Sequence, residues 1–144
     1  MFVGVRGLTQ EERPLSKVVP LLVAVLVCDT AAADPATGKK NLIGIFDRVN
    51  VRTFPSQRPM SVYVKLTDAE GSYKIQLRYV QTGSGQEFAR AEAPAEFASR
   101  LRSLDFVIST PPLPIPSEGR YEFQVFANDV YLGGTFIDAV AQPQ

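Results

Sequence analysis

The chain has 144 residues, of which 45% are hydrophobic and 21% charged, and its 15 basic side chains balance its 15 acidic ones. This length and composition are typical of a single folded domain with its own apolar core. Zero net charge excludes an overall electrostatic field that would attract nucleic acid or an anionic membrane. Because the sequence has no histidine and one cysteine, it excludes Ser-His-Asp and Cys-His catalysis, Cys/His zinc sites and an intrachain disulfide.

The N-terminal residues differ in character from the rest of the chain. Residues 1–19 contain charges of both signs, among them Glu11, Glu12 and Arg13. We predict a polar N-terminal extension without fixed structure over residues 1–19, followed by a single β-sandwich domain over residues 20–142.

The stretch KVVPLLVAVLVCDTAAADP at residues 17–35 has two interpretations. As a signal peptide, it has eleven uncharged residues (18–28) and an A-x-A pattern at Ala31 and Ala33, with cleavage after Ala33. As a strand, it is valine-rich, and apolar residues on both faces are typical of a central strand buried on both sides. Eleven residues are too few for a transmembrane helix, which needs about 20.

The residues that follow favour the strand. Asp34–Lys40 has the composition of a connection between two strands, because Pro35 stiffens it and Gly38 permits a positive φ. Cleavage after Ala33 would make the mature chain begin inside this turn. We therefore predict a strand and a cytoplasmic protein; the alternative is a secreted or periplasmic protein.

From Asn41 onward, apolar residues alternate with polar ones, which is typical of strands. LIGIFDRVNV (42–51) is predicted to place Ile43 and Ile45 on one face together with Val49 and Val51. SVYVKLT (61–67) and SYKIQLRYVQ (72–81) are predicted to form a hairpin around the DAEG turn. Its predicted apolar faces are Val62, Val64 and Leu66 on the first strand, with Tyr63 on the other face, and Tyr73, Ile75, Leu77 and Tyr79 on the second.

The segment PAEFASRLRSL at residues 94–104 shows a different spacing. Phe97, Leu101 and Leu104 recur at helical intervals, and Pro94 suits a first helical position, so a short helix is predicted near 94–104. LDFVIST (104–110) is again predicted to be a strand. The proline-rich PPLPIP (111–116) is predicted to carry the chain from one sheet to the other.

The C-terminal part is predicted to form a hairpin. GRYEFQVFA (119–127) and VYLGGTFIDAV (130–140) flank Asn128-Asp129, two residues that tolerate left-handed φ. In all, about seven or eight short strands predict an all-β fold, an antiparallel Ig-like β-sandwich. The cysteine pair and the tryptophan of antibody domains are missing from the sequence.

The search for reactive groups assigns no catalytic, cofactor-binding or metal-binding residue. The sequence has no P-loop, GxGxxG or S-x-x-K motif. Asp29, Asp34 and Asp47 could approach one another if the first two strands pair, but their spacing matches no calcium loop. Asp47, followed by Arg48, interrupts an apolar face; the strand bends there, or Asp47 forms a buried ion pair, or it binds a ligand. Cys28 is interpreted as a small buried hydrophobe.

Several markers resemble those of an uncharacterised bacterial family, a domain of unknown function. The markers are Cys28-Asp29, Thr37-Gly38-Lys39 and Gly44-Ile45-Phe46-Asp47, followed by the LTDAEG turn and the GRYEF strand. The resemblance covers residues 20–140. It implies a single small cytoplasmic β domain that starts near Pro20, and it carries over no functional residues.

These observations predict a non-enzymatic β-sandwich that acts as a protein-binding or structural module. Its expected partner is another protein or a second copy of itself, because sheet edges offer unpaired backbone groups. No nucleic acid, membrane span or cofactor is expected, and a small-molecule ligand is left undefined. The alternative is an exported β-sandwich that binds carbohydrate or cell-envelope components after signal cleavage near Ala33.

Overall fold

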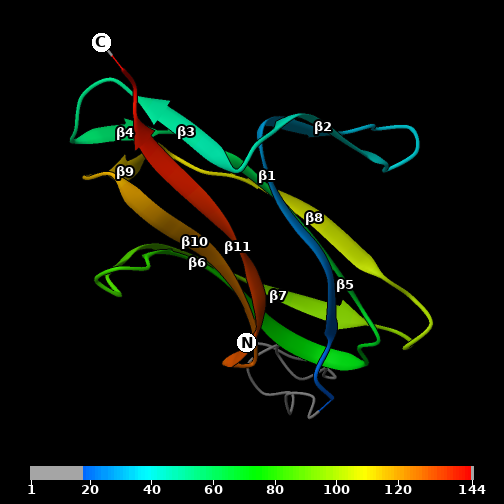
Figure 1. The fold of residues 1–144 in the computed structure, drawn as a ribbon. Helices are drawn as coiled ribbons and strands as arrows, with labels where there is room; N and C mark the ends of the chain where they lie inside the picture. Colours follow the sequence, from blue (N-terminus) through cyan, green and yellow to red (C-terminus); the bar gives the residue numbers. More distant parts are fainter. Residues whose placement is uncertain (1–17, 144) are drawn as a thin grey trace.

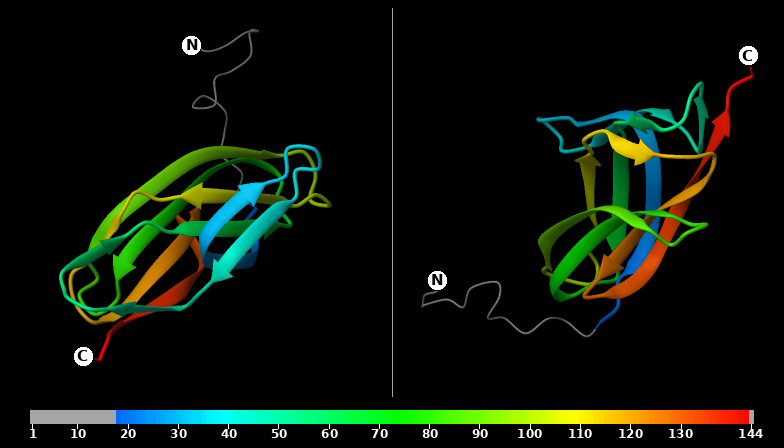
Figure 2. Two further views of the ribbon diagram at one scale, coloured as in Figure 1. Left: turned by 90° about the horizontal axis from the view of Figure 1, so that it is seen from above. Right: turned by 90° about the vertical axis from the view of Figure 1, so that its left-hand side faces the viewer.

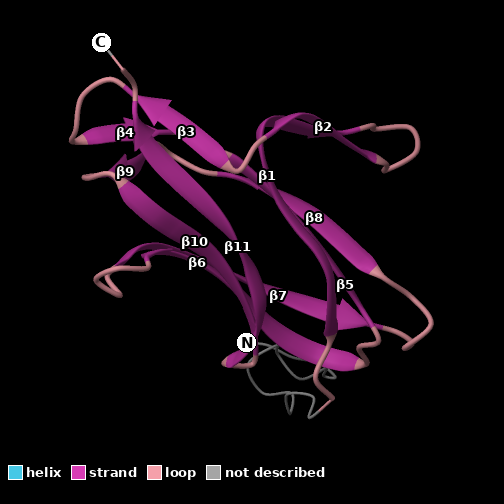
Figure 3. Cartoon of the chain, in the orientation of Figure 1, coloured by secondary structure: helices cyan, strands magenta, loops and turns pink. Residues whose placement is uncertain are grey.

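The computed structural model describes residues 18–143 and shows an all-β sandwich (Figure 1). Within these residues there is no helix, and therefore none long and apolar enough to cross a membrane (Figure 3). One layer is a four-stranded sheet of order β2-β1-β5-β8, and the other is a five-stranded sheet of order β3-β11-β10-β6-β7. A short pair, β4-β9, lies apart from both. The strands are β1 (Leu21–Ala33), β2 (Lys40–Ile45), β3 (Arg48–Val51), β4 (Ser56–Arg58), β5 (Ser61–Thr67), β6 (Gly71–Gln81), β7 (Glu87–Phe97), β8 (Leu104–Ser109), β9 (Leu113–Ile115), β10 (Gly119–Ala127) and β11 (Val130–Ala141).

The core lies between the two sheets. Figure 2 shows the two sheets from above and from the left-hand side of Figure 1. On β5, alternate residues are completely buried, as the period-two pattern predicts. On β6, the predicted inward row is buried as well. The buried side chains of these two strands are Val62, Val64, Leu66, Tyr73, Ile75, Leu77 and Tyr79.

The valine-rich opening stretch is β1, which confirms its interpretation as a strand. β1 pairs antiparallel with β5 along Leu21–Cys28 and with β2 along Cys28–Ala33. The prediction that it is buried on both sides is wrong, because only Val27 and Cys28 of β1 are buried, whereas Leu21 is 58% exposed and Val23 50% exposed. Among residues 18–143, no further sheet covers the outer face of the four-stranded sheet, so side chains on that face stay exposed.

The segment 42–51 is two strands rather than one. β2 ends at Ile45 and β3 begins at Arg48, and the two belong to different sheets. The predicted common face is therefore wrong, because Ile43 and Ile45 are exposed whereas Val49 and Val51 are buried. The chain bends at Asp47, whose carbonyl accepts a hydrogen bond from the Asp138 amide at 2.9 Å. The Asp47 side chain is exposed, so the structure supports the bend and excludes a buried ion pair.

The predicted hairpin between β5 and β6 is also wrong. β5 pairs with β1 and β8, whereas β6 pairs with β7 and β10. The short connection crosses from one sheet to the other, with Asp68 at a positive φ of 56° and Ala69 fully buried. A tight turn between two alternating segments therefore marks a change of layer here.

Residues 94–104 form no helix, contrary to the sequence prediction. β7 continues to Phe97, which is buried, and Leu104 begins β8. Leu101, in the intervening loop, is 96% exposed, so the three residues share no apolar face. Pro94 is tolerated in β7 because this is an edge strand. Residues 18–143 form eleven strands rather than seven or eight, since the short β3, β4 and β9 lack a clear sequence signal.

The other sequence predictions for the second half are confirmed. The proline-rich segment connects β8 of one sheet to β10 of the other and contributes β9 on the way. β10 and β11 form the C-terminal hairpin, with Asn128 and Asp129 at φ of 49° and 67°. Near the start of β10, the Tyr121 hydroxyl donates to the Ser117 carbonyl four residues upstream at 2.6 Å, as in the tyrosine corner of Ig-type sandwiches.

Replacing Phe123 by alanine tests the core. Phe123 is 1% exposed and its ring centroid lies 5.0 Å from that of Tyr79, so truncation leaves a cavity among aromatic side chains. We expect a loss of about 3–5 kcal/mol in the free energy of unfolding, measured by chemical denaturation. The control L101A removes an exposed side chain and should change this energy by less than about 0.5 kcal/mol. Equal effects of the two substitutions would contradict the described core.

Candidate functional site

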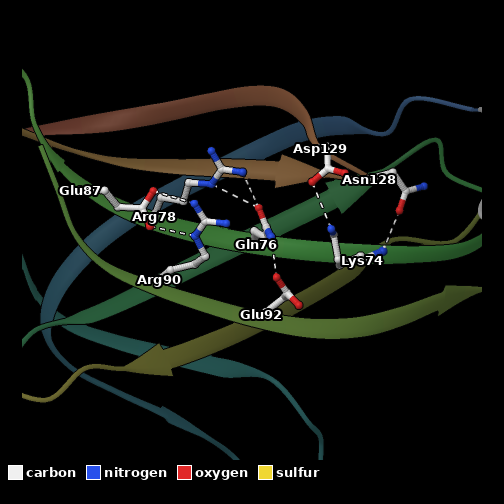
Figure 4. Close-up of polar contacts among 8 residues, drawn as sticks. All are labelled: Lys74, Gln76, Arg78, Glu87, Arg90, Glu92, Asn128 and Asp129. Carbon is white, nitrogen blue, oxygen red and sulfur yellow. Dashed lines mark hydrogen bonds and ion pairs between the residues drawn. The ribbon is translucent and has the colours of Figure 1, made fainter. Parts of the chain in front are cut away.

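The outer surface of the five-stranded sheet carries a network of polar side chains centred on β6 (Figure 4). The strand register brings these side chains together: Gln76 lies opposite Glu92 of β7 and Phe126 of β10, and Arg78 lies opposite Arg90 of β7. We call this surface the polar face; its members are Lys74, Gln76, Arg78, Glu87, Arg90, Glu92, Glu122, Gln124, Phe126 and Tyr131.

Gln76 is the centre of the polar face and is only 2% exposed. Its amide nitrogen donates to a Glu92 carboxylate oxygen, and its amide oxygen accepts from Arg78 Nη2 at 2.7 Å. The Arg78 guanidinium lies 3.7 Å from the Phe126 ring centroid, a cation–π contact that covers Gln76. The buried amide is thus hydrogen-bonded on both sides, as a buried polar group must be.

Charge pairs around Gln76 lie within β7 and between β6 and the β10–β11 turn. Arg90 donates to both Glu87 carboxylate oxygens at 2.8 and 2.9 Å, which lowers the pKa of Glu87. Lys74 lies 3.1 Å from Asp129, in the turn between β10 and β11, and the Lys74 amide donates to Asn128 Oδ1. Of the two opposed arginines, Arg90 pairs with the Glu87 carboxylate, whereas Arg78 donates to the neutral Gln76 amide and lies over the Phe126 ring. The Arg78 charge also contributes to the lowered pKa of Glu87.

Glu122 forms the second centre of the polar face. It is 8% exposed and accepts hydrogen bonds from Gln124 Nε2 at 2.8 Å and from the Tyr131 hydroxyl at 2.7 Å. Gly134 makes room for this carboxylate, since a Cβ at Gly134 would lie 2.6 Å from Glu122 Oε2. Burial, together with the bond to Glu122, raises the pKa of Tyr131 to about 12.

The candidate carboxylates from the sequence are not assembled into a site. Asp29 pairs with Arg58 at 2.7 Å, and Asp34 accepts the Ala36 amide within the turn between β1 and β2. Among residues 18–143, no three acidic or cysteine side chains converge as metal ligands would. Cys28 is fully buried, and burial raises the pKa of its thiol, so its environment fits a small core residue.

A second surface, which the sequence did not predict, is apolar and exposed. It runs along the first half of β1 and onto β2, and its side chains are between 36% and 65% exposed. We call it the apolar edge; its members are Leu21, Val23, Leu26, Ile43 and Ile45. Ile45 lies opposite Cys28 and Ile43 opposite Thr30 in the β1–β2 ladder, so the β2 members lie beside the second half of β1.

The β1–β2 hairpin that carries part of the apolar edge is fixed to the sheet by a charge pair. Lys40 Nζ lies 2.8 Å from Asp105 Oδ1 on β8, and the Tyr63 hydroxyl on β5 donates to the other oxygen at 2.9 Å. Lys40 and this hydrogen bond lower the pKa of Asp105, which keeps the carboxylate charged. The apolar edge is therefore held on a defined framework.

Two clefts open between the edge strands β7 and β8. Their volumes are about 150 and 200 Å³, and both are lined by Leu77, Ala91 and Ile108. The small alanines of β7 leave this side of the core less covered than the others. Neither cleft holds converging polar groups of the kind that orient a substrate.

Two facing sheets, a tyrosine corner and crossing connections define the protein as an immunoglobulin-like β-sandwich. The chain belongs to a family of unknown function, DUF6941, whose model matches residues 23–138, and this confirms the resemblance seen in the sequence. It is similar to an immunoglobulin-like protein from Pseudomonas aeruginosa with 15% identity and a TM-score of 0.37, over 81% of this chain and 97% of that one. No curated protein matches the sequence.

The bond between Glu122 and Tyr131 can be tested by titration. Substituting Glu122→Gln removes the carboxylate charge, so we expect the Tyr131 pKa to fall from about 12 toward its usual value of about 10. Part of the elevation should remain, because burial is its largest cause. The measurement is the ¹³Cζ shift of labelled tyrosine against pH. The control D138N removes an exposed carboxylate from the same strand and should leave the Tyr131 pKa unchanged; an E122Q pKa that stays at about 12 would contradict the described contact.

Proposed function

We propose that this protein is a non-enzymatic protein-binding module of the cytoplasm and that it contacts its partner through the apolar edge. The observation that supports the proposal is the exposure of five large apolar side chains along two adjacent strands. Exposed apolar groups that gather in one place mark interaction surfaces, whereas single exposed ones need no explanation. Leu101 is an example of the second kind.

The two surfaces of the sandwich differ in what they offer a partner. On the polar face, the buried groups Gln76 and Glu122 already have their hydrogen bonds within the chain. A ligand there would have to replace contacts that exist. On the apolar edge, a partner would gain free energy by removing exposed side chains from water, at about 25 cal/mol per Å². This difference favours the apolar edge as the contact surface.

The position of β1 supports a cytoplasmic location over export with cleavage near Ala33. Cleavage there would remove Leu21–Ala33, the strand that joins β2 to β5. It would also expose the inner side of β5, which is buried at Val62, Val64 and Leu66. The exported carbohydrate-binding or envelope-binding protein is therefore the weaker alternative.

Mass spectrometry of the protein isolated from its native host tests this choice. We expect the intact mass to include residues 21–33, because β1 completes the four-stranded sheet. Peptide mapping of the same sample provides the control by locating the first residue. A mature chain that begins at Asp34 would contradict the proposed location.

Photo-cross-linking in the native host tests the contact surface. A benzophenone amino acid in place of Ile43, which is 65% exposed, should give protein adducts after irradiation. The matched control carries the same amino acid in place of Leu101, which is exposed but isolated from the apolar edge, and should give none. Equal adducts at both positions, or none at position 43, would contradict protein binding through the apolar edge.

A further inference from the structure

We infer that the partner at the apolar edge is a second copy of this chain, paired antiparallel along the first half of β1. This inference rests on the proposed function and specifies its partner. The pairing would join two four-stranded sheets, β8-β5-β1 of one copy and β1-β5-β8 of the other, into one continuous sheet across a two-fold axis.

The first observation is a free backbone edge. On one side, β1 pairs with β5 from Leu21 onward. On the other side, the ladder with β2 starts at Cys28, and one further bond joins the Phe46 amide to the Val27 carbonyl. Within residues 18–143, residues 21–26 thus have a hydrogen-bonded strand neighbour on one side alone. Unpaired amides and carbonyls of this kind are a template for another strand.

The second observation is a difference between this edge and the edges formed by β7, β8, β3 and β2. β7 carries Pro94 and four charged side chains, and β8 carries Asp105. β3 carries Arg48, and β2 carries Lys40 and, at a positive φ of 74°, Gly44. In the described part of the chain, residues 130–137 of β11 also lack charge and pair on one side alone, but they contain Gly133 and Gly134 and lie beside β1. Charges and prolines are the usual means by which a protein protects an edge from pairing. Residues 21–27 of β1 have neither, although a bulge interrupts their pairing with β5 between Leu22 and Ala24.

The third observation concerns the identity of the partner. Residues 18–28 contain no charge, so an antiparallel pair of two such strands brings no like charges together. Any strand paired antiparallel with itself about a two-fold axis is self-complementary, since residue i meets residue j and j meets i. An uncharged, β-branched edge therefore fits a second copy without a further chemical requirement.

The contact must extend beyond the two strands. A stable interface buries about 800 Å² on each partner, more than one short strand pair supplies. Further apolar area is available on both sides of β1. Ile45 of β2 is 57% exposed, and Val130 is 44% exposed at the start of β11, which runs beside β1 (Figures 1 and 2). The Leu22 side chain packs over Gly133 of β11 and fixes this neighbourhood.

The test is the mass of the full chain in solution, by size-exclusion chromatography with light scattering over a concentration series. We expect about twice 15.8 kDa for the wild-type protein. V23K places a charge on the paired edge of both copies and should raise the dimer dissociation constant about a hundredfold, since juxtaposed like charges at an interface cost several kcal/mol. The control L101K adds the same charge to an apolar site that is more exposed than Val23, 96% against 50%, and lies outside the apolar edge, so this variant should remain dimeric.

A second substitution and the cross-linking result distinguish failure of the second-copy inference from failure of the proposed function. V23P removes a backbone N–H from the edge and should also give monomers, with unchanged far-UV circular dichroism showing that the fold persists. A wild-type monomer at all concentrations, or a dimer that survives both V23K and V23P, overturns the second-copy inference. If position 43 then forms adducts with a different protein, the proposed function stands; if it forms none, both fail.

Discussion

The sandwich depends on the burial of β5 and β6 against each other across the two layers. The short crossing at residues 68–71 sends two alternating segments into opposite sheets, so that their apolar rows become the two walls of one core. Val62, Val64 and Leu66 meet the aromatic row of β6, and Tyr79 stacks with Tyr121 at 5.7 Å. Every other described strand except the separate pair β4-β9 is added to one of these two walls, and the surfaces discussed above are the outer sides and ends of that arrangement.

The outer surfaces of the two sheets differ in their side chains. The five-stranded sheet covers its outside with hydrogen-bonded and charged side chains, to the extent that Gln76 and Glu122 are themselves buried. The four-stranded sheet leaves apolar side chains of β1 and β2 exposed to water. Because solvent exposure of apolar area is unfavourable, the exposed side chains of β1 and β2 raise the free energy of the folded protein unless a partner covers them. That asymmetry is the reason for assigning the contact surface to β1 and β2.

Period-two alternation was enough to predict most of the longer strands, the inward rows of β5 and β6 and the all-β class, because side-chain direction in a strand is a local property. Sheet membership is not local. The DAEG turn suits a hairpin and a crossing equally well, and the spacing of Phe97, Leu101 and Leu104 suits a helix as well as a strand end and a loop. The exposure of Val23 and the burial of Gln76 depend on partners far along the chain, which an isolated sequence does not identify.

The burial of Cys28 has a practical consequence for labelling. It is the sole thiol of the chain, it is inaccessible to solvent, and burial raises its pKa, so little reactive thiolate is present near neutral pH. A cysteine introduced on the surface would therefore be modified selectively by a maleimide dye or spin label without removal of the native residue. Distances between any two chosen positions could then be measured by fluorescence or electron spin resonance in an otherwise unaltered protein.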